Sequence, residues 1–315
     1  MKKVNLLVTG CGGDIGQSIG KILNYSVYIS KLFGCDISEK NAAKFIYKNF
    51  SISLPCNHPD YLNHLISFIE INKIDFVLPI AEPELRFFTS TSKVSGLSWD
   101  KMILASHKAL SIGFDKLKTA EFLAVEGMPF PATSALDLIT EPKELPVILK
   151  SKTGSGSSKV HFVEDIEAFH FLVKRNPDFI MQEYLKNTDG EYTCGLFRSS
   201  NGTIRNIILK RELTGGYSGY GEVVAHNEIS ELLIKIAEKL NLIGSINVQL
   251  RLVDNIPFVF EINPRFSSTV FFRHMFGFRD VEWSIQDKLG IALSEYNANN
   301  IGKKFYKGFA EYISK

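Results

Sequence analysis

Two apolar segments in the second half of the chain, residues 244–252 and 257–265, carry polar side chains at every second position. These side chains are Asn247, Gln249, Glu261 and Asn263. Side chains two residues apart on a β-strand point to the same face of the sheet. We therefore predict two strands around a turn at Asp254 and Asn255, each with a polar pair on one face. A solvated polar face on an edge hairpin is the alternative, although the flanking Val, Leu and Ile residues are an awkward surface pattern.

The register of this hairpin decides whether the polar pairs meet. Pairing of Val253 with Pro257 would place Gln249 opposite Glu261 and the two asparagines opposite each other. Such a set of oxygen ligands suits a hard cation such as Mg²⁺, which takes one or two protein carboxylates and completes its shell with phosphate oxygens and water. Arg265, two residues after Asn263, could bind a phosphate oxygen in bidentate fashion.

A glycine- and serine-rich segment, residues 150–159, is suited to polyphosphate. Its loop includes Ser155, Gly156 and Ser157, and such small residues let backbone amides approach an anion closely. Lys150, on the preceding strand, can supply a positive charge. The segment lacks the GxxxxGK[ST] pattern that leads into a helix in a Walker motif. Taken alone, a flexible surface hairpin is an equally good interpretation.

A second glycine-rich segment, residues 210–221, begins with the basic residues Lys210 and Arg211. Loops of this composition can close over a site. We expect Arg211 to contact a carboxylate or the transferring phosphate, with Lys210 and Arg265 as further candidate catalytic residues. A mobile surface loop is the alternative. Arg273 and His274 are second candidates for acceptor binding, against the alternative of a buried structural histidine.

The first third of the chain is predicted to form a sheet whose strand ends lie at a cleft. Apolar runs at 4–8 and 75–79 and a strand ending at Asp36 alternate with helical patterns at 14–25 and 59–72. This rhythm predicts a parallel α/β sheet. Glu82 and Glu84 follow the last of these strands, at the carboxyl edge of the sheet, where they could hold an amine. A solvated loop is the simpler interpretation of both residues.

The glycines at positions 10, 12, 13 and 16, with Asp36 beyond them, imitate a dinucleotide fingerprint. GxGxxG counted from Gly10 requires glycine where Ile15 stands, so the match is partial and a nicotinamide-dependent reductase is a weak alternative. We expect this turn to open the first helix and to face a substrate anion.

The rest of the chain changes character. A helix at 115–127 precedes Pro129 and Pro131, which force extended backbone and suit a linker. Strands at 147–150 and 160–163 around the glycine and serine loop then suggest antiparallel pairing. We predict an α/β first part, an α+β second part and a domain boundary between residues 105 and 130.

In this order the motifs resemble those of the ATP-grasp superfamily, most closely the carbamoyl-phosphate synthase large-chain type. The motifs are Asp115-Lys116, Gly127-Met128-Pro129-Phe130-Pro131, the Lys150 strand with its loop, Gln182-Glu183-Tyr184-Leu185 before Gly190-Glu191-Tyr192, Asn247-x-Gln249, and Glu261-x-Asn263-Pro264-Arg265. The similarity covers residues 1–290. It implies a Rossmann-like domain at 1–110, an ATP-grasp N-terminal subdomain at 111–184 and a C-terminal subdomain with the metal site at 185–315.

The resemblance also implies residue roles. Lys116 and Lys150 would contact ATP phosphates, the backbone at Glu183 and Leu185 would meet the adenine, and Glu191 would bind the ribose. The full implied nucleotide set is Lys116, Lys150, Ser155, Gly156, Ser157, Glu183, Tyr184, Leu185, Glu191 and Asn247. Gln249 and Glu261 would hold one Mg²⁺, and Glu261 and Asn263 a second, with Mn²⁺ as an alternative metal.

The expected function is an ATP-dependent carboxylate–amine ligase that forms an acyl phosphate and releases ADP and phosphate. Activation of bicarbonate, as in biotin carboxylase or carbamoyl phosphate synthesis, is the main alternative. A non-catalytic nucleotide-binding scaffold is another. The expected partners are a small-molecule carboxylate and an amine, and a homodimer is left open.

The composition excludes several other classes. The 315 residues include 36 basic and 34 acidic side chains, with no basic run that could follow a nucleic-acid backbone. The four cysteines are irregularly spaced, which argues against a zinc site or a disulfide framework. No apolar stretch approaches the roughly 18 residues of a membrane span. We therefore expect a cytoplasmic protein with reduced thiols.

Overall fold

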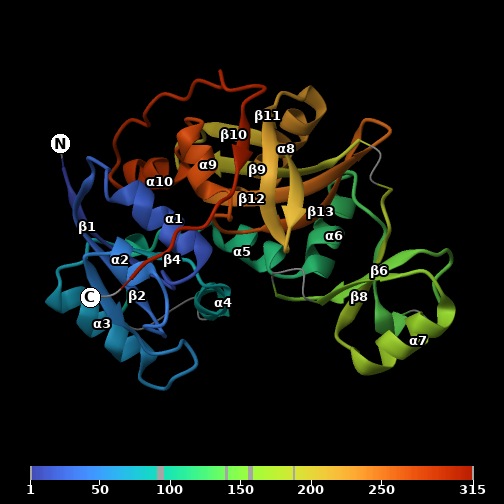
Figure 1. Cartoon of the computed structure of the whole chain (residues 1–315), viewed down its shortest axis with the longest axis horizontal. Coiled ribbons are helices and arrows are strands. Elements are labelled where there is room, and N and C mark those ends of the chain that lie inside the picture. The colour runs from blue at the N-terminus through green and yellow to red at the C-terminus, as the bar shows by residue number, and fades with distance from the viewer. Residues whose placement is uncertain (1, 91–95, 139–140, 155–158, 187–188, 314–315) are drawn as a thin grey trace.

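The computed structural model describes residues 2–90, 96–138, 141–154, 159–186 and 189–313. Its strands form three sheets, one parallel and two antiparallel. The parallel sheet lies at one end of the molecule, the large antiparallel sheet in the middle and the small antiparallel sheet at the other end (Figure 1). The predicted combination of an α/β first part with an α+β second part is confirmed.

The N-terminal sheet has the order β3-β2-β1-β4. Its strands are β1 (Val4–Thr9), β2 (Ile29–Asp36), β3 (Asn49–Ile52) and β4 (Phe76–Pro79). Its helices are α1 (Asp14–Leu23), α2 (Ala43–Ile46), α3 (Tyr61–Ile71) and α4 (Glu82–Ser90). β1 is apolar almost throughout because the sheet is covered on both faces, as expected for a parallel sheet. Glu82 and Glu84, predicted in a loop, begin helix α4.

The central sheet has the order β13-β12-β9-β10-β11-β14. Its strands are β9 (Glu191–Arg198), β10 (Ile204–Thr214), β11 (Tyr217–Val224), β12 (Gly244–Val253), β13 (Ile256–Asn263) and β14 (Lys304–Tyr306). Helices α5 (His107–Gly113), α6 (Lys116–Val125) and α8 (Asn227–Lys239) bury their apolar side chains against one face of it. Helices α9 (Val270–Met275) and α10 (Asp280–Lys288) follow β13, and α9 packs on α1 of the N-terminal domain.

The small lobe holds the sheet β5-β8-β6-β7 and one helix. Its elements are β5 (Thr133–Ala135), β6 (Val147–Ser151), β7 (Val160–Val163), α7 (Ile166–Arg175) and β8 (Phe179–Glu183). Short 3₁₀ turns at Trp99–Lys101 and Leu136–Leu138 complete the regular structure of the described ranges. In space, α5 and α6 pack with the central sheet, so the lobe begins after the linker near Met128 rather than at residue 111.

In the β12–β13 hairpin the polar residues pair as predicted, but the turn between the strands differs from the predicted one. Its turn residues, Asp254 and Asn255, have φ values of +50° and +63°, as in a two-residue type I′ turn. Val253 therefore pairs with Ile256 and not, as predicted, with Pro257. The register shifts by one residue beyond Leu250, where Phe260 is the extra residue of a β-bulge. After the shift, Gln249 pairs with Glu261 and Asn247 with Asn263, as predicted.

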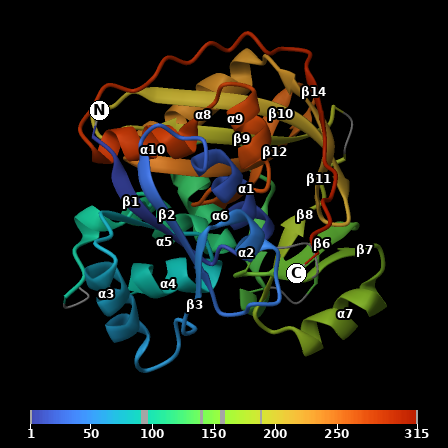
Figure 2. The ribbon, with the colours of Figure 1, turned by 60° about the vertical axis from the view of Figure 1, so that its left-hand side comes forward.

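The C-terminal tail returns to the N-terminal domain. After β14 it runs past α1 toward α2, as both views show (Figures 1 and 2). The Lys307 ammonium pairs with Asp14 at the start of α1, and its backbone N–H donates to Gly219 of β11. Further along, the Tyr312 ring stacks on Phe45 of α2. The tail therefore ties the central sheet to the N-terminal domain. Within the described ranges, no helix is long and apolar enough to span a membrane.

Candidate active site

A cavity of about 760 Å³, here called the first cavity, lies between the small lobe and the central sheet. It collects side chains from β6, β8, β9, β10, β12, β13 and α6. The sequence-predicted residues that line it are Lys116, Lys150, Glu183, Tyr184, Leu185, Glu191, Arg211, Gln249 and Glu261. These residues are spread over more than 140 positions of sequence, from Lys116 to Glu261, and the fold brings them together in one place.

Lys150 is the buried cation of the first cavity. Its side chain is only 6% exposed, and its ammonium donates to Gln182 Oε1 at 2.8 Å and to the Phe260 carbonyl at 3.4 Å. Burial lowers the pKa of Lys150 to about 8, against the opposing influence of Glu261. The ammonium is thus poised to change its charge just above neutral pH.

Lys116 connects the glycine and serine loop to the hairpin. It is the first residue of α6, whose N-cap, Asp115, accepts hydrogen bonds from two backbone N–H groups of the first turn. The Lys116 ammonium donates to the Gly154 carbonyl at 2.7 Å and lies 3.8 Å from Glu261 Oε1. It therefore places a positive charge beside the carboxylate of the predicted metal site.

Glu191 holds two arginines at the wall of the first cavity. Oε1 accepts from Arg211 at 3.1 and 2.8 Å, and Oε2 accepts from Arg251 at 3.0 and 2.9 Å. Arg211 also donates to Gln249 Oε1 at 2.9 Å, and Arg251 to the Leu185 carbonyl at 2.9 Å. Both oxygens of the predicted ribose ligand are thus engaged by guanidinium groups. Arg211 in turn lies beside a predicted metal ligand.

The predicted metal ligands fit a site that depends on phosphate oxygens. Gln249 and Glu261 both line the first cavity, whereas Asn263, two residues after Glu261 on the same strand, is buried and does not line it. In the described part of the chain, no cluster of three or more His, Cys, Asp or Glu residues could hold a metal by itself. One carboxylate with amide oxygens suits Mg²⁺, which keeps much of its shell for phosphate and water.

Several predicted residues do not line the first cavity. Lys210 is exposed on the face of β10 opposite to Arg211, with its ammonium 6.0 Å from the centre of the Tyr192 ring. This follows from the alternation of side chains along a strand. Asn247 is 1% exposed, and its carbonyl oxygen accepts from Thr193 and Arg273. We therefore leave Lys210 and Asn247 out of the candidate site. Ser155, Gly156 and Ser157 lie outside the described residues.

Arg273 and His274, the second candidates for acceptor binding, do not line the first cavity. Arg273 is fully buried, and its guanidinium lies 3.6 Å from Asp280, which accepts from Ser245. Burial lowers the pKa of His274. The Arg273 guanidinium donates to the side-chain oxygen of Asn247 and so holds Asn247 within the core.

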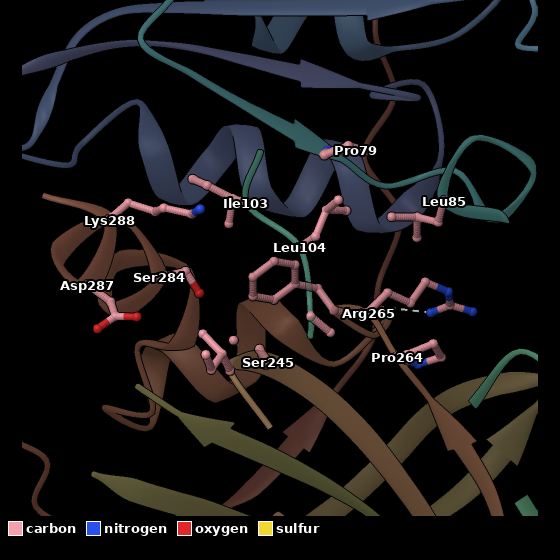
Figure 3. Close-up of a pocket in the computed structure, with 14 residues that line it drawn as sticks. Pro79, Leu85, Ile103, Leu104, Ser245, Pro264, Arg265, Ser284, Asp287 and Lys288 are labelled. Atoms are coloured by element: carbon pink, nitrogen blue, oxygen red, sulfur yellow. Dashed lines mark hydrogen bonds between the residues drawn. The ribbon is translucent and has the colours of Figure 1, made fainter. Parts of the chain in front are cut away.

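Arg265 stands one step away from the first cavity. β13 ends at Asn263, so Arg265 is no longer on the strand face that carries Glu261. It lines a narrow crevice of about 30 Å³ between the N-terminal domain and α10, where its guanidinium donates to the Phe266 carbonyl at 2.9 Å (Figure 3). It also lines a second cavity of about 520 Å³ at the carboxyl edge of the parallel sheet. Arg265 thus lines the second cavity and does not line the first.

Among the residues of the first cavity that sequence reasoning missed are Arg251, Gln182 and Phe260. The alternation that identified Gln249 also places Arg251 on the same face, so this residue could have been found. Gln182 was noted only as part of a motif, and its contact with Lys150 needs the pairing of β6 with β8. Phe260 reaches the cavity through the bulge, which has no clear sequence signal.

Comparison with known proteins gives one family and several relatives. Residues 114–269 match a family model described as an ATP-grasp domain. The carbamoyl phosphate synthase large chain of Methanoregula boonei is 24% identical over an alignment of 235 positions, and the match covers 67% of this chain and 21% of that protein. The chain thus spans about a fifth of the length of the curated relatives it matches.

Two solved structures share the fold. The N5-carboxyaminoimidazole synthetase of Staphylococcus aureus, solved with ADP, gives a TM-score of 0.72 at 17% identity and covers 93% of this chain and 79% of its own. The L-amino acid ligase of Bacillus licheniformis gives 0.68 at 16% identity and covers 92% and 75%. Identities this low establish the shared fold alone.

Proposed function

We propose that this chain, whose residues 114–269 match the ATP-grasp family model, is an ATP-dependent ligase that joins a carboxylate to an amine. The first cavity binds ATP with Mg²⁺, and the γ-phosphoryl group passes to the carboxylate. The amine then attacks the acyl phosphate and releases phosphate. A cytoplasmic setting, a homodimer and Mn²⁺ as a substitute metal are further expectations of this proposal.

One observation carries the proposal: the charges of the first cavity suit a polyphosphate with its metal. Three cations, Lys116, Lys150 and Arg211, surround the oxygen pair of Gln249 and Glu261. Phosphoryl transfer needs little covalent chemistry from a protein and depends mostly on position and charge. The cavity offers both.

Each residue of the first cavity has a defined task in this proposal. Gln249, Glu261 and Asn263 would hold the metal, which neutralises phosphate charge during transfer when bound. Lys116 and Lys150 bind phosphate oxygens, and Lys150 is fixed for this task by Gln182. Arg211, held by Glu191, orients the reacting carboxylate or phosphate. Glu183 to Leu185 form the edge of the cavity where the adenine binds.

A phosphate-release screen tests the proposal. The protein is incubated with ATP and Mg²⁺ across pairs of amino acids, sugar acids and amines, and both nucleotide and phosphate products are measured. We expect ADP and phosphate release to increase only when a matching carboxylate and amine are both present. Formation of AMP and pyrophosphate, or failure of the protein to bind ATP with Mg²⁺, would contradict the proposal.

The pKa of Lys150 predicts how nucleotide affinity depends on pH. Because the pKa is about 8, the ammonium loses its proton as pH rises past 8 and its attraction for phosphate is lost. We expect the dissociation constant of ADP to rise toward tenfold per pH unit above pH 8. Calorimetric titrations from pH 7 to pH 9.5 measure it. Lys150→Arg is the matched control, because a guanidinium stays charged and should give a flat profile.

The lowered pKa of Lys150 also makes the free energy of unfolding depend on pH. The folded pKa of about 8 lies below the ordinary value of 10.5, so between these values the unfolded chain binds more protons than the folded chain. The contribution of Lys150 to the free energy of unfolding therefore rises with pH across this window. Lys150→Arg should abolish this contribution. In the ADP titrations described above, a wild-type pH profile as flat as that of Lys150→Arg would show that Lys150 does not contact phosphate.

A further inference from the structure

A lysine is the least exposed residue of an otherwise exposed C-terminal tail. After β14 the chain leaves β11 and continues toward α2 (Figure 2). The structure describes residues 306–313 of this tail, and of these only Lys307 is not exposed, with 13% of its side chain accessible. Lysine is seldom buried unless its charge is paired. The burial of this side chain therefore depends on what its ammonium contacts.

Lys307 contacts two elements that lie far apart in the sequence. Its ammonium pairs with the Asp14 carboxylate at the start of α1. The ammonium also lies 5.2 Å from the centre of the Tyr217 ring at the start of β11, which is within the range of a cation–π interaction. The backbone N–H of Lys307 donates to the Gly219 carbonyl at 2.8 Å. Lys307 thus joins α1 to the turn between β10 and β11.

The β10–β11 turn has backbone freedom that this joint restricts. Gly215 and Gly216 are its two central residues, with φ values of +59° and +86°. Gly219 is the extra residue of a β-bulge in β11. Glycine is conformationally permissive, and a bulge interrupts the ladder of hydrogen bonds between two strands. Contacts from outside the hairpin therefore help to fix the turn, and the tail supplies such contacts.

The same turn forms part of the first cavity. Leu213 and Gly216 line the cavity directly. Ser218 is buried, and its hydroxyl oxygen accepts from the Arg211 guanidinium at 3.2 Å. Arg211 lines the cavity as well and donates to Gln249 Oε1 at 2.9 Å. A displacement of the turn would therefore change both the wall of the cavity and the position of Arg211.

The tail beyond β14 buries little apolar surface. Phe305 of β14 is buried, whereas Phe309 and Ile313 further along are exposed. The Phe309 ring meets the Tyr217 ring edge-on, with the ring centres 6.1 Å apart. A segment with few buried apolar contacts opens at a low cost in free energy. The buried ammonium of Lys307 is therefore the contact that decides whether this part of the tail stays attached to the turn.

We propose that Lys307 is a latch, which holds the β10–β11 turn closed on the first cavity and thereby keeps Arg211 in place. Release of the ammonium from Asp14 and Tyr217 lets the turn open. Lys307 does not line the first cavity, so it is a positioning residue that acts through the turn. The latch itself is a property of the fold, whereas its effect on nucleotide binding rests on the proposed function.

Hydrogen exchange of the full-length protein measures the latch without any ligand. Lys307→Met removes the ammonium and keeps an unbranched apolar side chain. We expect this variant to raise the exchange rate of the amides of residues 213–220 by about fivefold, the range of a partly exposed ion pair. The amides of β9 and β12 should be unchanged. Lys307→Arg keeps the positive charge and should exchange like the wild-type protein. Lys303→Met, at an exposed position just before β14, is the matched control and should have no effect.

A double-mutant cycle with Asp14→Asn shows whether the ion pair carries the effect. Alone, Asp14→Asn should raise the exchange of the turn by less than Lys307→Met, because the ammonium still contacts the Tyr217 ring. In the Lys307→Met background it should cause no further increase. An effect of Asp14→Asn that is equally large in both backgrounds would overturn the latch, because the two residues would then act separately.

Titration with ADP and Mg²⁺ measures what the latch does for the first cavity. The apparent affinity falls with the fraction of protein whose turn is closed. We therefore expect Lys307→Met to raise the dissociation constant of ADP by up to about fivefold, and Lys307→Arg and Lys303→Met to leave it unchanged.

Two results of these experiments would overturn the latch: an equal rise of exchange in the turn, β9 and β12 of Lys307→Met, or exchange in Lys307→Arg as fast as in Lys307→Met. An unchanged ADP affinity in Lys307→Met would overturn its effect on the first cavity. A wild-type protein that binds no ADP would reject the proposed function, and a rise of exchange confined to the turn would still support the latch.

Discussion

Glu261→Gln is expected to reduce the ATP-dependent release of phosphate by about a thousandfold or more, since a bound metal supplies several kcal/mol of transition-state stabilisation. Glu261 lines the first cavity and is the carboxylate of the predicted metal set, next to Lys116 at 3.8 Å. The substitution keeps the size of the side chain and removes its charge. The loss should appear in turnover and in the affinity for ATP measured with Mg²⁺.

Glu121→Gln is the matched control for this variant. Glu121 is exposed on α6, the same helix that carries Lys116, so the change in net charge is identical. We expect the control to retain full activity. Thermal unfolding should show that both variants are folded, because neither residue belongs to the apolar core. Turnover in Glu261→Gln equal to that of the wild-type protein would remove the metal assignment.

Glu191→Gln is expected to lower the free energy of unfolding by about 3 kcal/mol, because removing one partner of a buried ion pair leaves charge uncompensated. The side chains of Glu191 and Arg211 are 11% and 8% exposed, and that of Arg251 is 25% exposed. The neutral amide would leave two guanidinium groups close together without their shared carboxylate. Denaturant unfolding measures the loss.

A double-mutant cycle separates this effect from a general loss of packing. Arg251→Gln in the Glu191→Gln background removes one of the two uncompensated charges, so the second substitution should cost less there than in the wild-type protein. Glu212→Gln, at an exposed position next to Arg211 on β10, is the control and should change stability by no more than about 0.5 kcal/mol. Additive effects of Glu191→Gln and Arg251→Gln would show that Glu191 does not hold the two arginines together.

The central hairpin was largely predictable from the sequence. Alternation of polar and apolar residues is a direct consequence of strand geometry, and it correctly placed Gln249 opposite Glu261. The predicted route was wrong, because Asp254 and Asn255 form a two-residue turn and a bulge at Phe260 then restores the register. A bulge depends on how the strand packs and carries no fixed residue pattern. The sequence therefore showed neither the one-residue error at the turn nor the bulge that corrects it.

Other parts of the candidate site depend on tertiary contacts that no local pattern encodes. The engagement of Glu191 by two arginines requires β9 to lie between β10 and β12. The burial of Asn247 follows from Arg273, which reaches it from α9. The acidic character of the second cavity arises where four strand ends and two helix starts meet. Composition alone, with nearly balanced charge, gave no sign of it.

The contrast between the two cavities agrees with a reaction between unlike substrates. The first cavity gathers cations around two oxygen ligands, which favours a polyphosphate with a metal. The second is lined by four carboxylates and by Arg265. Arg265 lines the second cavity, four residues after Glu261 of the first.

Oxygen-18 transfer shows whether the γ-phosphoryl group of ATP passes to a carboxylate. A carboxylate identified by the phosphate-release screen is labelled with oxygen-18 in its carboxyl group and turned over with ATP, Mg²⁺ and the amine. The account predicts ADP together with phosphate that carries one oxygen-18 atom taken from the carboxylate. Unlabelled phosphate, or AMP and pyrophosphate as products, would contradict it.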